Sequence, residues 1–486
     1  MTDLTGDSIP VPLAPGVVLT APGLVGSAEL RPGVVLRGES RGPEQARDEV
    51  IAALAATDFV QTHSVEVRAR EEPSVGGDGT RTDAGEPGMR LTVPAVDDSQ
   101  AQVLLLVDEF GVATWHLPDR TSNTAETSFT VERRVAPGAE GDAPTRGLFA
   151  AAAAKLLSVF VVPLLEAAVG RAAVSAARWY EDRQRPQGLR LLTPSGLRHP
   201  GEGRLDAPLR WDDGPALLFV HGTASASHSG FGSLADDLDI LHQRYGGRLL
   251  AFDHHTLSAD LDDNVRLLTQ EWARVGPREI DIVSHSRGGL VARAVAAAAE
   301  QGRLPVTVRR VVYVSTPNDG TTLAEPENVR MWVDRMTTML NLIPDGPWSV
   351  ATDTLVGVLI VVRTLAAGAV GNLPGLVTMR PGGEVLRDLP VPGPSVEQYA
   401  LDADFEPDGP LVDWMRLADG VVDRVFEDRA NDVVVPTTGV TSIKGRPEFV
   451  VPADHHVSLG RTGQTWHCSM FGSDTVKGAL TSWLTA

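Results

Sequence analysis

The chain has 486 residues, more than one hydrophobic core usually serves, so at least two domains are expected. Its 43 Lys and Arg residues stand against 63 Asp and Glu residues. The resulting net charge of −20 disfavours binding to nucleic acids, whose phosphates carry the same sign. With a single cysteine, Cys468, no intrachain disulfide can form. This cysteine count, and an N-terminus without a basic and apolar signal, predict a cytoplasmic protein.

A β-rich domain of unknown role is expected in residues 1–140. A helical pattern at 43–56 comes first, and a stretch rich in Gly, Pro and charge at 71–88 predicts a loop. Five runs have the alternating or apolar pattern of strands: 63–70, 89–96, 101–109, 112–118 and 127–135. None of them carries recognisable chemistry, and they do not identify a protein partner for this domain.

A helical connector is expected in residues 141–187, because much of this segment is rich in Ala, Leu and Val. Pro163 predicts a break into two helices. The segment contains one of two apolar stretches, 148–170 and 354–370, that approach the length of a membrane span. Charged residues such as Arg363 interrupt both stretches. Buried helices are therefore expected, with lid or interfacial helices as the alternative.

Strand-like runs alternate with helical patterns from residue 188 to the end. The strands are expected at 189–193, 216–220, 248–252, 280–284, 308–315, 397–401 and 447–451. Helical patterns such as 259–275 and 289–301 lie between them. This alternation predicts an α/β domain over 188–486, with a doubly wound, mostly parallel sheet covered on both faces. In such a sheet, reactive groups gather at the carboxyl ends of the strands.

One strand end carries a serine in a pattern that suits a nucleophile. In 279-EIDIVSHSRGGLVARAVAAAAEQG-302, Ser286 stands between an apolar strand and an alanine-rich helix. A tight turn there exposes the serine hydroxyl at the helix N-terminus, and it needs small residues two before and two after. Those residues are Ser284 and Gly288, so the usual G-x-S-x-G pattern has a serine in place of its first glycine. The alternative is a simple small-residue turn before a helix.

The loop after the strand at 216–220 suits the stabilisation of an oxyanion. This strand ends in 220-VHGT-223. Acyl transfer needs backbone N–H groups aimed at the oxygen that becomes negative. One is expected from Arg287, which follows the nucleophile, and the other from Thr223, where Gly222 lets the backbone come close. An ordinary strand-end turn is the alternative.

Four stretches of this domain carry a resemblance to a known fold family. They are 220-VHGT-223, 283-VSHSRGG-289, 314-VSTPNDGTTLA-324 and 430-ANDVVVP-436. Together with 375-GLVTMRPGGEVLRDL-389, they resemble motifs of α/β-hydrolases of the bacterial lipase-like group. The resemblance covers about residues 188–486, and it implies an α/β-hydrolase fold with a Ser-His-Asp triad.

The resemblance implies that an acid and then a histidine follow the nucleophile in the chain. Asp432 stands in a stretch similar to the acid loop of the family, whereas Asp402 also ends a predicted strand and remains a rival. His467 precedes a closing helical pattern, as the histidine of lipase-like hydrolases does. His455 and His456 remain rivals for the base. Asp432 and His467 are the preferred pair.

A long insert at about 325–390 lies where such enzymes carry a cap. Its apolar helical patterns predict a helical cap that covers Ser286 and forms an acyl pocket from Met and Leu side chains. Transient contact with a membrane surface through this cap is a further expectation. The chain is predicted to hydrolyse carboxylic esters of small molecules or lipids through an acyl-enzyme. A non-catalytic binding protein of the same fold, a peptidase and a thioesterase are the alternatives.

No cofactor and no metal are expected for this chemistry. Two triplets, 253-DHH-255 and 454-DHH-456, do have the residue types of metal ligands. Adjacent histidines on an extended backbone point to opposite sides, which makes it hard for one ion to bind both. The first triplet ends a predicted strand and is expected to line the wall of the site.

Overall fold

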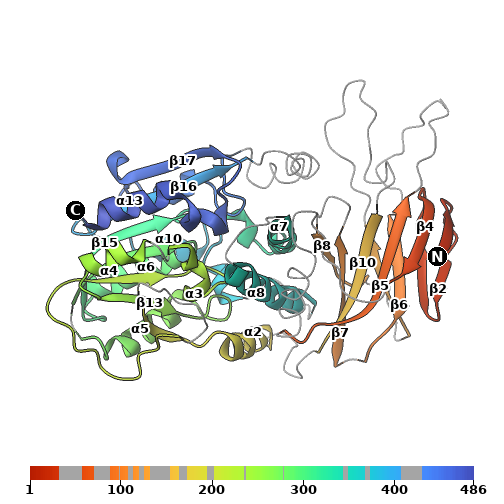
Figure 1. Cartoon of the computed structure of the whole chain (residues 1–486), viewed down its shortest axis with the longest axis horizontal. Coiled ribbons are helices and arrows are strands. Elements are labelled where there is room, and N and C mark those ends of the chain that lie inside the picture. Colours follow the sequence, from red (N-terminus) through yellow and green to blue (C-terminus); the bar gives the residue numbers. More distant parts are fainter. Residues whose placement is uncertain are drawn as a thin grey trace.

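The structure is a computed structural model, and it describes residues 1–31, 57–69, 88–97, 99–107, 113–119, 125–131, 154–163, 172–193, 202–234, 237–276, 278–342, 348–366, 373–406 and 429–485. A β-rich part lies at one end of the molecule and an α/β part at the other (Figure 1). Helices α7 (Val329–Leu342) and α8 (Trp348–Ala366) lie between the two. The helix predicted at 43–56 lies outside the described residues, as does nearly all of the loop predicted at 71–88.

Two antiparallel sheets build the N-terminal part. The strands are β1 (Thr2–Thr5), β2 (Val11–Ala14), β3 (Val17–Thr20), β4 (Val25–Leu30), β5 (Val60–Ala69), β6 (Met89–Pro94), β7 (Gln100–Val107), β8 (Ala113–His116), β9 (Glu126–Val131) and β10 (Ala154–Pro163). One sheet has the order β1-β4-β5-β10-β7-β8 and the other the order β2-β3-β6-β9. Leu91 and Phe129 of the second sheet share a hydrophobic core with Val65 and Leu104 of the first. The two sheets therefore pack face to face.

The five strands predicted in this part are present as β5 to β9. In β6 and β9 buried side chains alternate with more exposed ones, which is the pattern that made these runs recognisable. Strands β1 to β4 were not predicted. Each of them has only four to six residues, too few for a clear period.

Strand β10 corrects the prediction of a helical connector over 141–187. It pairs with β5 on one side and β7 on the other, and among the described residues of this segment only α2 (Ala172–Gln184) is helical. Leu157 faces the core between the two sheets, whereas Phe160 belongs to the cluster that includes the insert helices. Because both faces of the strand are buried, its sequence lacks the alternation that marks a half-buried strand. The N-terminal part thus extends to residue 163.

A seven-stranded sheet forms the centre of the C-terminal part. Its order is β11-β13-β12-β14-β15-β16-β17, and every neighbouring pair is parallel except β11 with β13. The strands are β11 (Gly188–Leu191), β12 (Ala216–Val220), β13 (Leu249–Asp253), β14 (Arg278–His285), β15 (Val306–Val314), β16 (Glu397–Phe405) and β17 (His456–Thr462). The mostly parallel sheet predicted from the alternation of strands and helices is confirmed.

The last predicted strand, 447–451, is wrong. These residues adopt a turn and an irregular stretch, and the seventh strand is β17 instead. Pro447 opens the run and has no N–H to donate to a strand ladder. Phe449 is buried against the core, but its N–H donates to the carbonyl of Arg446 within the turn. The run therefore resembles a strand in the sequence because it contains Phe449, which is buried although it lies in a turn.

Helices cover both faces of the seven-stranded sheet. Helices α5 (Leu261–Trp272) and α6 (Gly288–Glu300) pack on one face, and α4 (Leu238–Arg244) and α13 (Asp474–Thr485) pack on the other. Helix α6 begins at the serine turn and is buried almost all round. Its many alanines are consistent with this position, because small side chains let the neighbouring elements come close.

Helix α7 covers the open edge of the six-stranded sheet. Thr338 Oγ1 accepts a hydrogen bond from the N–H of Ala113 and donates one to its carbonyl, both at 3.0 Å. Asp334 accepts from the N–H of Trp115 at 2.7 Å. Side chains of this helix thus satisfy backbone groups that the edge strand β8 would otherwise leave without a partner in the sheet.

The apolar stretch predicted at 354–370 forms part of helix α8 as far as it is described. Its side chains join one continuous hydrophobic cluster with Trp115 and the outer face of the six-stranded sheet. Arg363 is buried, and its guanidinium donates to the carbonyl of Thr57 at 3.1 Å and to that of Pro163. The stretch is therefore a buried helix whose charge binds the N-terminal part. Across the described ranges, no helix combines the length and the apolar character that crossing a membrane requires.

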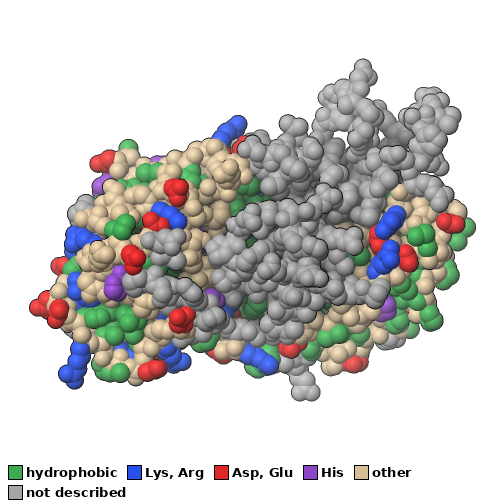
Figure 2. All heavy atoms as spheres, in the orientation of Figure 1, with side chains coloured by type: hydrophobic (Ala, Val, Ile, Leu, Met, Phe, Trp, Pro, Cys, Tyr) green, Lys and Arg blue, Asp and Glu red, His purple; other side chains and the backbone are tan. Residues whose placement is uncertain are grey.

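Charged side chains of the α/β part are interspersed on its surface. Figure 2 shows Lys, Arg, Asp and Glu side chains of both signs scattered over the face that it presents. Some form exposed ion pairs, such as Arg266 with Asp263 at 2.7 Å, and such pairs contribute little to stability.

Candidate active site

Ser286 occupies a strained turn between strand β14 and helix α6. Its φ is +53°, in the left-handed region that residues other than glycine rarely adopt. Two hydrogen bonds hold the turn, because the N–H of Ser286 donates to the carbonyl of Val314 and its own carbonyl accepts from the N–H of Gly289, both at 2.9 Å. Ser286 borders a pocket of the α/β part. The strand-to-helix turn predicted from the sequence is thus present.

The small residues around the turn are explained by close contacts. A Cβ on Gly288 would lie 2.3 Å from the carbonyl oxygen of Val220, and a Cβ on Gly222 would lie 2.6 Å from the Cβ of Ser286. Ser284, which replaces the usual first glycine, is fully buried and donates its hydroxyl to the carbonyl of Val312 at 2.8 Å. Because this hydroxyl has an acceptor, a serine is accommodated at that position.

His467 and Asp432 form a buried pair. The Nδ1–H of His467 donates to Asp432 Oδ2 at 2.8 Å, and the N–H of His467 donates to the Asp432 carbonyl at 3.1 Å. The other carboxylate oxygen of Asp432 accepts from the N–H groups of Val434 at 3.0 Å and Val435 at 2.7 Å. Burial by itself would raise the pKa of Asp432, but the histidine and these donors outweigh it and hold that pKa below its ordinary value.

Ser286 and His467 line the same pocket. Since Nδ1 of His467 is bound to Asp432, the Nε2 atom is the ring nitrogen left for a reacting group. Within the described residues, no hydrogen bond joins the Ser286 hydroxyl to this ring; such bonds are often long before substrate binds. The structure brings the predicted serine and histidine to one pocket, with the predicted acid directly behind the histidine.

The rival residues pair with one another elsewhere. His456 Nε2 donates to Asp402 Oδ2 at 2.6 Å, and this carboxylate also accepts from Ser458. The ring of His455 stacks on Tyr399 with 4.1 Å between centroids. None of these residues is among those that line the pocket of Ser286. Asp402 and His456 thus form a second acid–histidine pair, without the serine.

The two predicted oxyanion donors are free to bind. The N–H groups of Thr223 and Arg287 have no hydrogen-bond partner in the described parts of the chain. Thr223 lies in the loop after β12 and lines the pocket, and Arg287 directly follows Ser286. Ala224, the next residue of the loop, has a φ of +56° and donates its N–H to Thr256 Oγ1 at 3.1 Å.

The side chain of Arg287 fixes the surroundings of its own amide. Its buried guanidinium donates to the carbonyls of Gly375 at 3.2 Å and Ala259 at 2.8 Å, and to Asn264 Oδ1 at 2.9 Å. Gly375 belongs to α9 (Pro374–Val377), a short helix of the insert. Burial lowers the pKa of Arg287 to about 10, so it keeps its charge at neutral pH. This side chain therefore joins the serine turn to the insert.

The wall of the pocket is mainly apolar. It consists of Leu323, Ala324, Val329, Trp332, Met336, Leu376, Met379 and Val434. Five of these eight residues come from the predicted insert at 325–390. Cys468 also borders the pocket, but burial raises the pKa of its thiol, so it stays protonated and unreactive. The pocket suits an apolar group placed next to Ser286.

Helix α7 lines the pocket with one face and contacts the N-terminal sheet with another. Val329, Trp332 and Met336 line the pocket, at the helical spacing that puts them on one side. Asp334 and Thr338 bind strand β8 of the N-terminal part. One pocket wall is therefore held in place by the edge of the N-terminal sheet.

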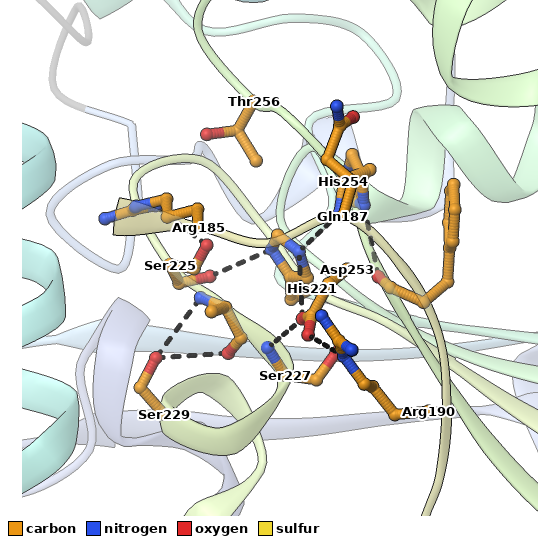
Figure 3. Close-up of polar contacts among 12 residues, drawn as sticks. Arg185, Gln187, Arg190, His221, Ser225, Ser227, Ser229, Asp253, His254 and Thr256 are labelled. Carbon is orange, nitrogen blue, oxygen red and sulfur yellow. Dashed lines mark hydrogen bonds and ion pairs between the residues drawn. The ribbon is translucent and has the colours of Figure 1, made fainter. Parts of the chain in front are cut away.

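A buried polar network joins the loop after β12, at Ser225 and Ser227, to Asp253 at the end of β13 (Figure 3). Asp253, at the end of β13, accepts from the N–H of Ser227 at 2.7 Å and from Arg190 Nε at 3.0 Å. His221 accepts from the N–H of His254 at 3.2 Å, and the two rings stack 4.3 Å apart. No three His, Cys, Asp or Glu side chains converge on a metal position in the described residues. The triplet at 253–255 was predicted to line the pocket. Asp253 and His254 belong to this buried network instead, and no residue of the triplet lines the pocket.

Buried histidines make the folded protein sensitive to acid. Burial lowers the pKa of His221 to about 4 and that of His285 to about 3. The unfolded chain binds these protons at about pH 6.5. Below that value it holds more protons than the folded chain, so the free energy of unfolding falls as the pH drops toward the folded pKa values. His221 alone should remove about 2 kcal/mol by about pH 5.

The variant His221→Asn measures this contribution. Urea unfolding at about pH 7 and about pH 5 should show a smaller loss of stability for the variant than for the parent chain, because the carboxylates common to both cancel. Equal losses in the two proteins would contradict the assignment of a neutral, buried His221.

Comparison with known proteins gives distant structural matches and one family match. No curated protein sequence matches the chain significantly. Lipase BlEst2 of Bacillus licheniformis is 17% identical, with a TM-score of 0.33, covering 58% of this chain and 96% of that one. Lipase 1 of Pelosinus fermentans is 14% identical, with a TM-score of 0.35, covering 56% and 98%. The Vlm2 thioesterase domain is 14% identical, with a TM-score of 0.30, covering 61% and 96%.

Because these TM-scores lie below 0.5, the fold is assigned from the chain itself. A mostly parallel sheet with helices on both faces, and a strained serine between its central strand β14 and helix α6, are the features of an α/β-hydrolase fold. A family profile matches residues 185–485, more than half of the chain, and this span contains the whole seven-stranded sheet. The chain belongs to the family described as "Domain of unknown function (DUF7379)".

Proposed function

We propose that the chain is a serine hydrolase that cleaves carboxylic esters. The observation that carries the proposal is the pocket that Ser286 shares with His467, whose Nδ1 is bound to the buried Asp432. A strained serine that lines a pocket, an oriented imidazole and a buried acid are the three parts that acyl transfer by serine requires. The free N–H groups of Thr223 and Arg287 supply the fourth part, a site for the oxyanion.

In the proposed reaction, Ser286 Oγ bonds to the ester carbonyl carbon while its proton moves to His467 Nε2. The carbonyl oxygen becomes negative and accepts hydrogen bonds from Thr223 and Arg287. The bond to the alkoxy group then breaks, and the proton of His467 passes to the departing alcohol. Water then attacks the acyl carbon and gives its proton to His467. The bond to Ser286 Oγ breaks, His467 returns the proton to Oγ, and the acid is released. Asp432 holds the imidazole in one tautomer and stabilises its charged form.

The insert at 325–390 is proposed to act as the cap of this site. Trp332, Met336 and Met379 border the pocket directly, and an acyl chain placed among them would lie out of water. Contact with a membrane surface through the insert stays a prediction, and the described apolar side chains of α8 face the interior of the protein. The substrate class favoured by this wall is an ester with an acyl chain of medium length.

Covalent labelling tests the proposed reaction. A fluorophosphonate should attach to the folded chain once per molecule, and mass analysis of its peptides should place the label on Ser286. A non-catalytic binding protein of the same fold would take no label. A labelled chain that cleaves thioesters or peptides but not matched oxygen esters would be assigned to those classes instead.

The acyl chain length preferred by the enzyme is a prediction of its own. Each CH₂ group buried in the apolar pocket contributes up to about 0.8 kcal/mol of transfer free energy. Two more methylenes should therefore raise kcat/KM by roughly tenfold. The measurement is a series of nitrophenyl esters from acetate to the twelve-carbon acid. A fall in kcat/KM from acetate onward would leave a small-ester or peptide hydrolase.

A matched pair of variants assigns the effect to the pocket. Met336→Ala removes part of the wall and should reduce the gain per methylene, or move the optimum to a longer chain. Ile240→Ala removes an exposed apolar side chain of α4 and should leave the series unchanged. If both variants behave like the parent chain, α7 does not contact the acyl group.

A further inference from the structure

We infer that Glu181 and Arg185, just before the α/β sheet, are positioning residues for the oxyanion site. They hold the loop at 222–226 in the strained form that presents the N–H of Thr223. The inference rests on the proposed function, because it concerns where this N–H points. Neither residue has a recognisable motif around it, and Glu181 lies outside the matched span at 185–485.

Glu181 is a fully buried carboxylate whose partners all belong to one loop. Its Oε1 atom accepts from the N–H of Thr256 at 2.8 Å, from Thr256 Oγ1 at 3.2 Å and from the N–H of Leu257 at 3.0 Å. Its Oε2 atom accepts from the N–H of Ser258 at 2.9 Å and from Ser258 Oγ at 2.6 Å. Burying a carboxylate is costly unless it is satisfied in this way. Glu181 therefore holds the loop after β13 against helix α2.

The pKa of Glu181 agrees with an ionised group at this place. Burial alone would raise it, but His255, Ser258 and Arg185 outweigh burial and hold the pKa below its ordinary value. An ionised Glu181 can only accept hydrogen bonds. The hydroxyl of Thr256 must therefore donate to it, which turns an oxygen lone pair toward the N–H of Ala224.

Arg185 binds the other side of the same peptide stretch. Its Nη1 donates to the carbonyl of Ser225 at 2.8 Å (Figure 3). Its Nη2 donates to that of Ala224 at 3.1 Å. Ala224 is thus fixed at its N–H through Thr256 and at its carbonyl through Arg185. Its φ of +56° is unfavourable for alanine and needs such outside support.

Helix α8 closes the loop from a third side. A Cβ on Gly357 would lie 2.3 Å from the Cβ of Ala224, so this helix packs directly against the strained residue. Thr223 directly precedes Ala224. The direction of the Thr223 N–H therefore depends on the backbone conformation of the loop at 222–226. Preorganised donors contribute to catalysis because they do not need to move when charge develops. Glu181 and Arg185 supply that preorganisation from helix α2 and the residue after it.

The test compares Glu181→Gln and Arg185→Ala with controls on the same helix. Loss of an oxyanion donor lowers kcat by about 10²–10³-fold, so a displaced donor should lower it by about ten- to a hundredfold, with KM for a nitrophenyl ester little changed. The controls are Asp182→Asn and Arg178→Ala, whose exposed side chains pair with His255 and Asp263. Both controls should keep the kcat of the parent chain.

Labelling separates positioning from folding. In Glu181→Gln and Arg185→Ala, the rate of fluorophosphonate labelling should fall in the same ratio as kcat, while the final label stays near one per chain. A purely structural role would instead lower the labelled fraction and leave the rate per folded molecule unchanged. Arg185→Lys, which keeps the charge and one donor direction, should recover part of the rate.

Thr256 provides a pair of variants without a change of charge. Thr256→Val removes the hydroxyl that links Glu181 to Ala224 and should slow both kcat and labelling, whereas Thr256→Ser keeps it and should restore both. Equal rates in Thr256→Val and Thr256→Ser overturn the inference, even if the Glu181 and Arg185 variants fail to fold. An unlabelled parent chain would refute the proposed function itself, and the inference would fall with it.

Discussion

Ser286→Ala should abolish both ester turnover and fluorophosphonate labelling. Removal of Oγ leaves no group that can form the acyl-enzyme, and such variants lose about 10⁴–10⁶-fold in rate. The fold should survive, because the turn is held by the backbone bonds of Ser286 to Val314 and Gly289 rather than by the serine side chain. The measurements are kcat/KM with the best nitrophenyl ester, label per chain, and thermal unfolding of the variant.

Ser284→Ala is the matched control for this variant. Ser284 lies two residues away and is equally buried, but its hydroxyl donates to the carbonyl of Val312 inside the sheet. Its loss should change stability slightly and labelling not at all. Label that persists in Ser286→Ala and disappears in Ser284→Ala would make Ser284 the nucleophile and refute the assignment of Ser286.

The serine turn was predictable from the sequence because its causes are local. The residues that define it lie within 284–288, and the strands on either side have the apolar, β-branched composition of buried parallel strands. Strand β12 was placed at 216–220, as observed, for the same reason. Close contacts of Gly222 and Gly288 with the neighbouring backbone then explain why small residues stand there.

The support of the site was not predictable, because its contacts join distant segments. Glu181 binds residues that stand more than 70 positions later in the chain, and Thr338 binds a strand edge more than 200 positions earlier. No pattern within a short window marks such partners. From the sequence alone, a Glu within an ordinary helical stretch is predicted to be solvated, although Glu181 is buried.

The acid and the base were left open for a related reason. Asp402 with His456, and Asp432 with His467, have the same residue types in the same order, and both pairs form in the structure. Of the two histidines in these pairs, His467 borders the pocket of Ser286 and His456 does not. The choice therefore depends on which pair the sheet and its loops bring to the serine, and on no property of the pairs themselves.

His467→Ala should lower kcat/KM by about 10⁴–10⁶-fold, since the serine then has no base to take its proton. Asp432→Asn should lower it by about 10⁴-fold, because an amide can hold the imidazole in the wrong tautomer. The second variant is the sharper test. The Asp432 side chain accepts from Val434 and Val435 as well as from His467, so its amide replacement keeps the shape of the loop while changing the proton arrangement.

The second pair supplies the controls. His456→Ala and Asp402→Asn remove the same kinds of group from a partly buried, hydrogen-bonded pair that does not border the pocket, so they should affect thermal stability more than kcat/KM. All four variants are compared by kcat/KM per folded chain, with the folded fraction taken from thermal unfolding. If His456→Ala were the inactive variant and His467→Ala the mild one, Ser286 would have to reach a base from β17. The closing loop before α13 would then have to rearrange when substrate binds.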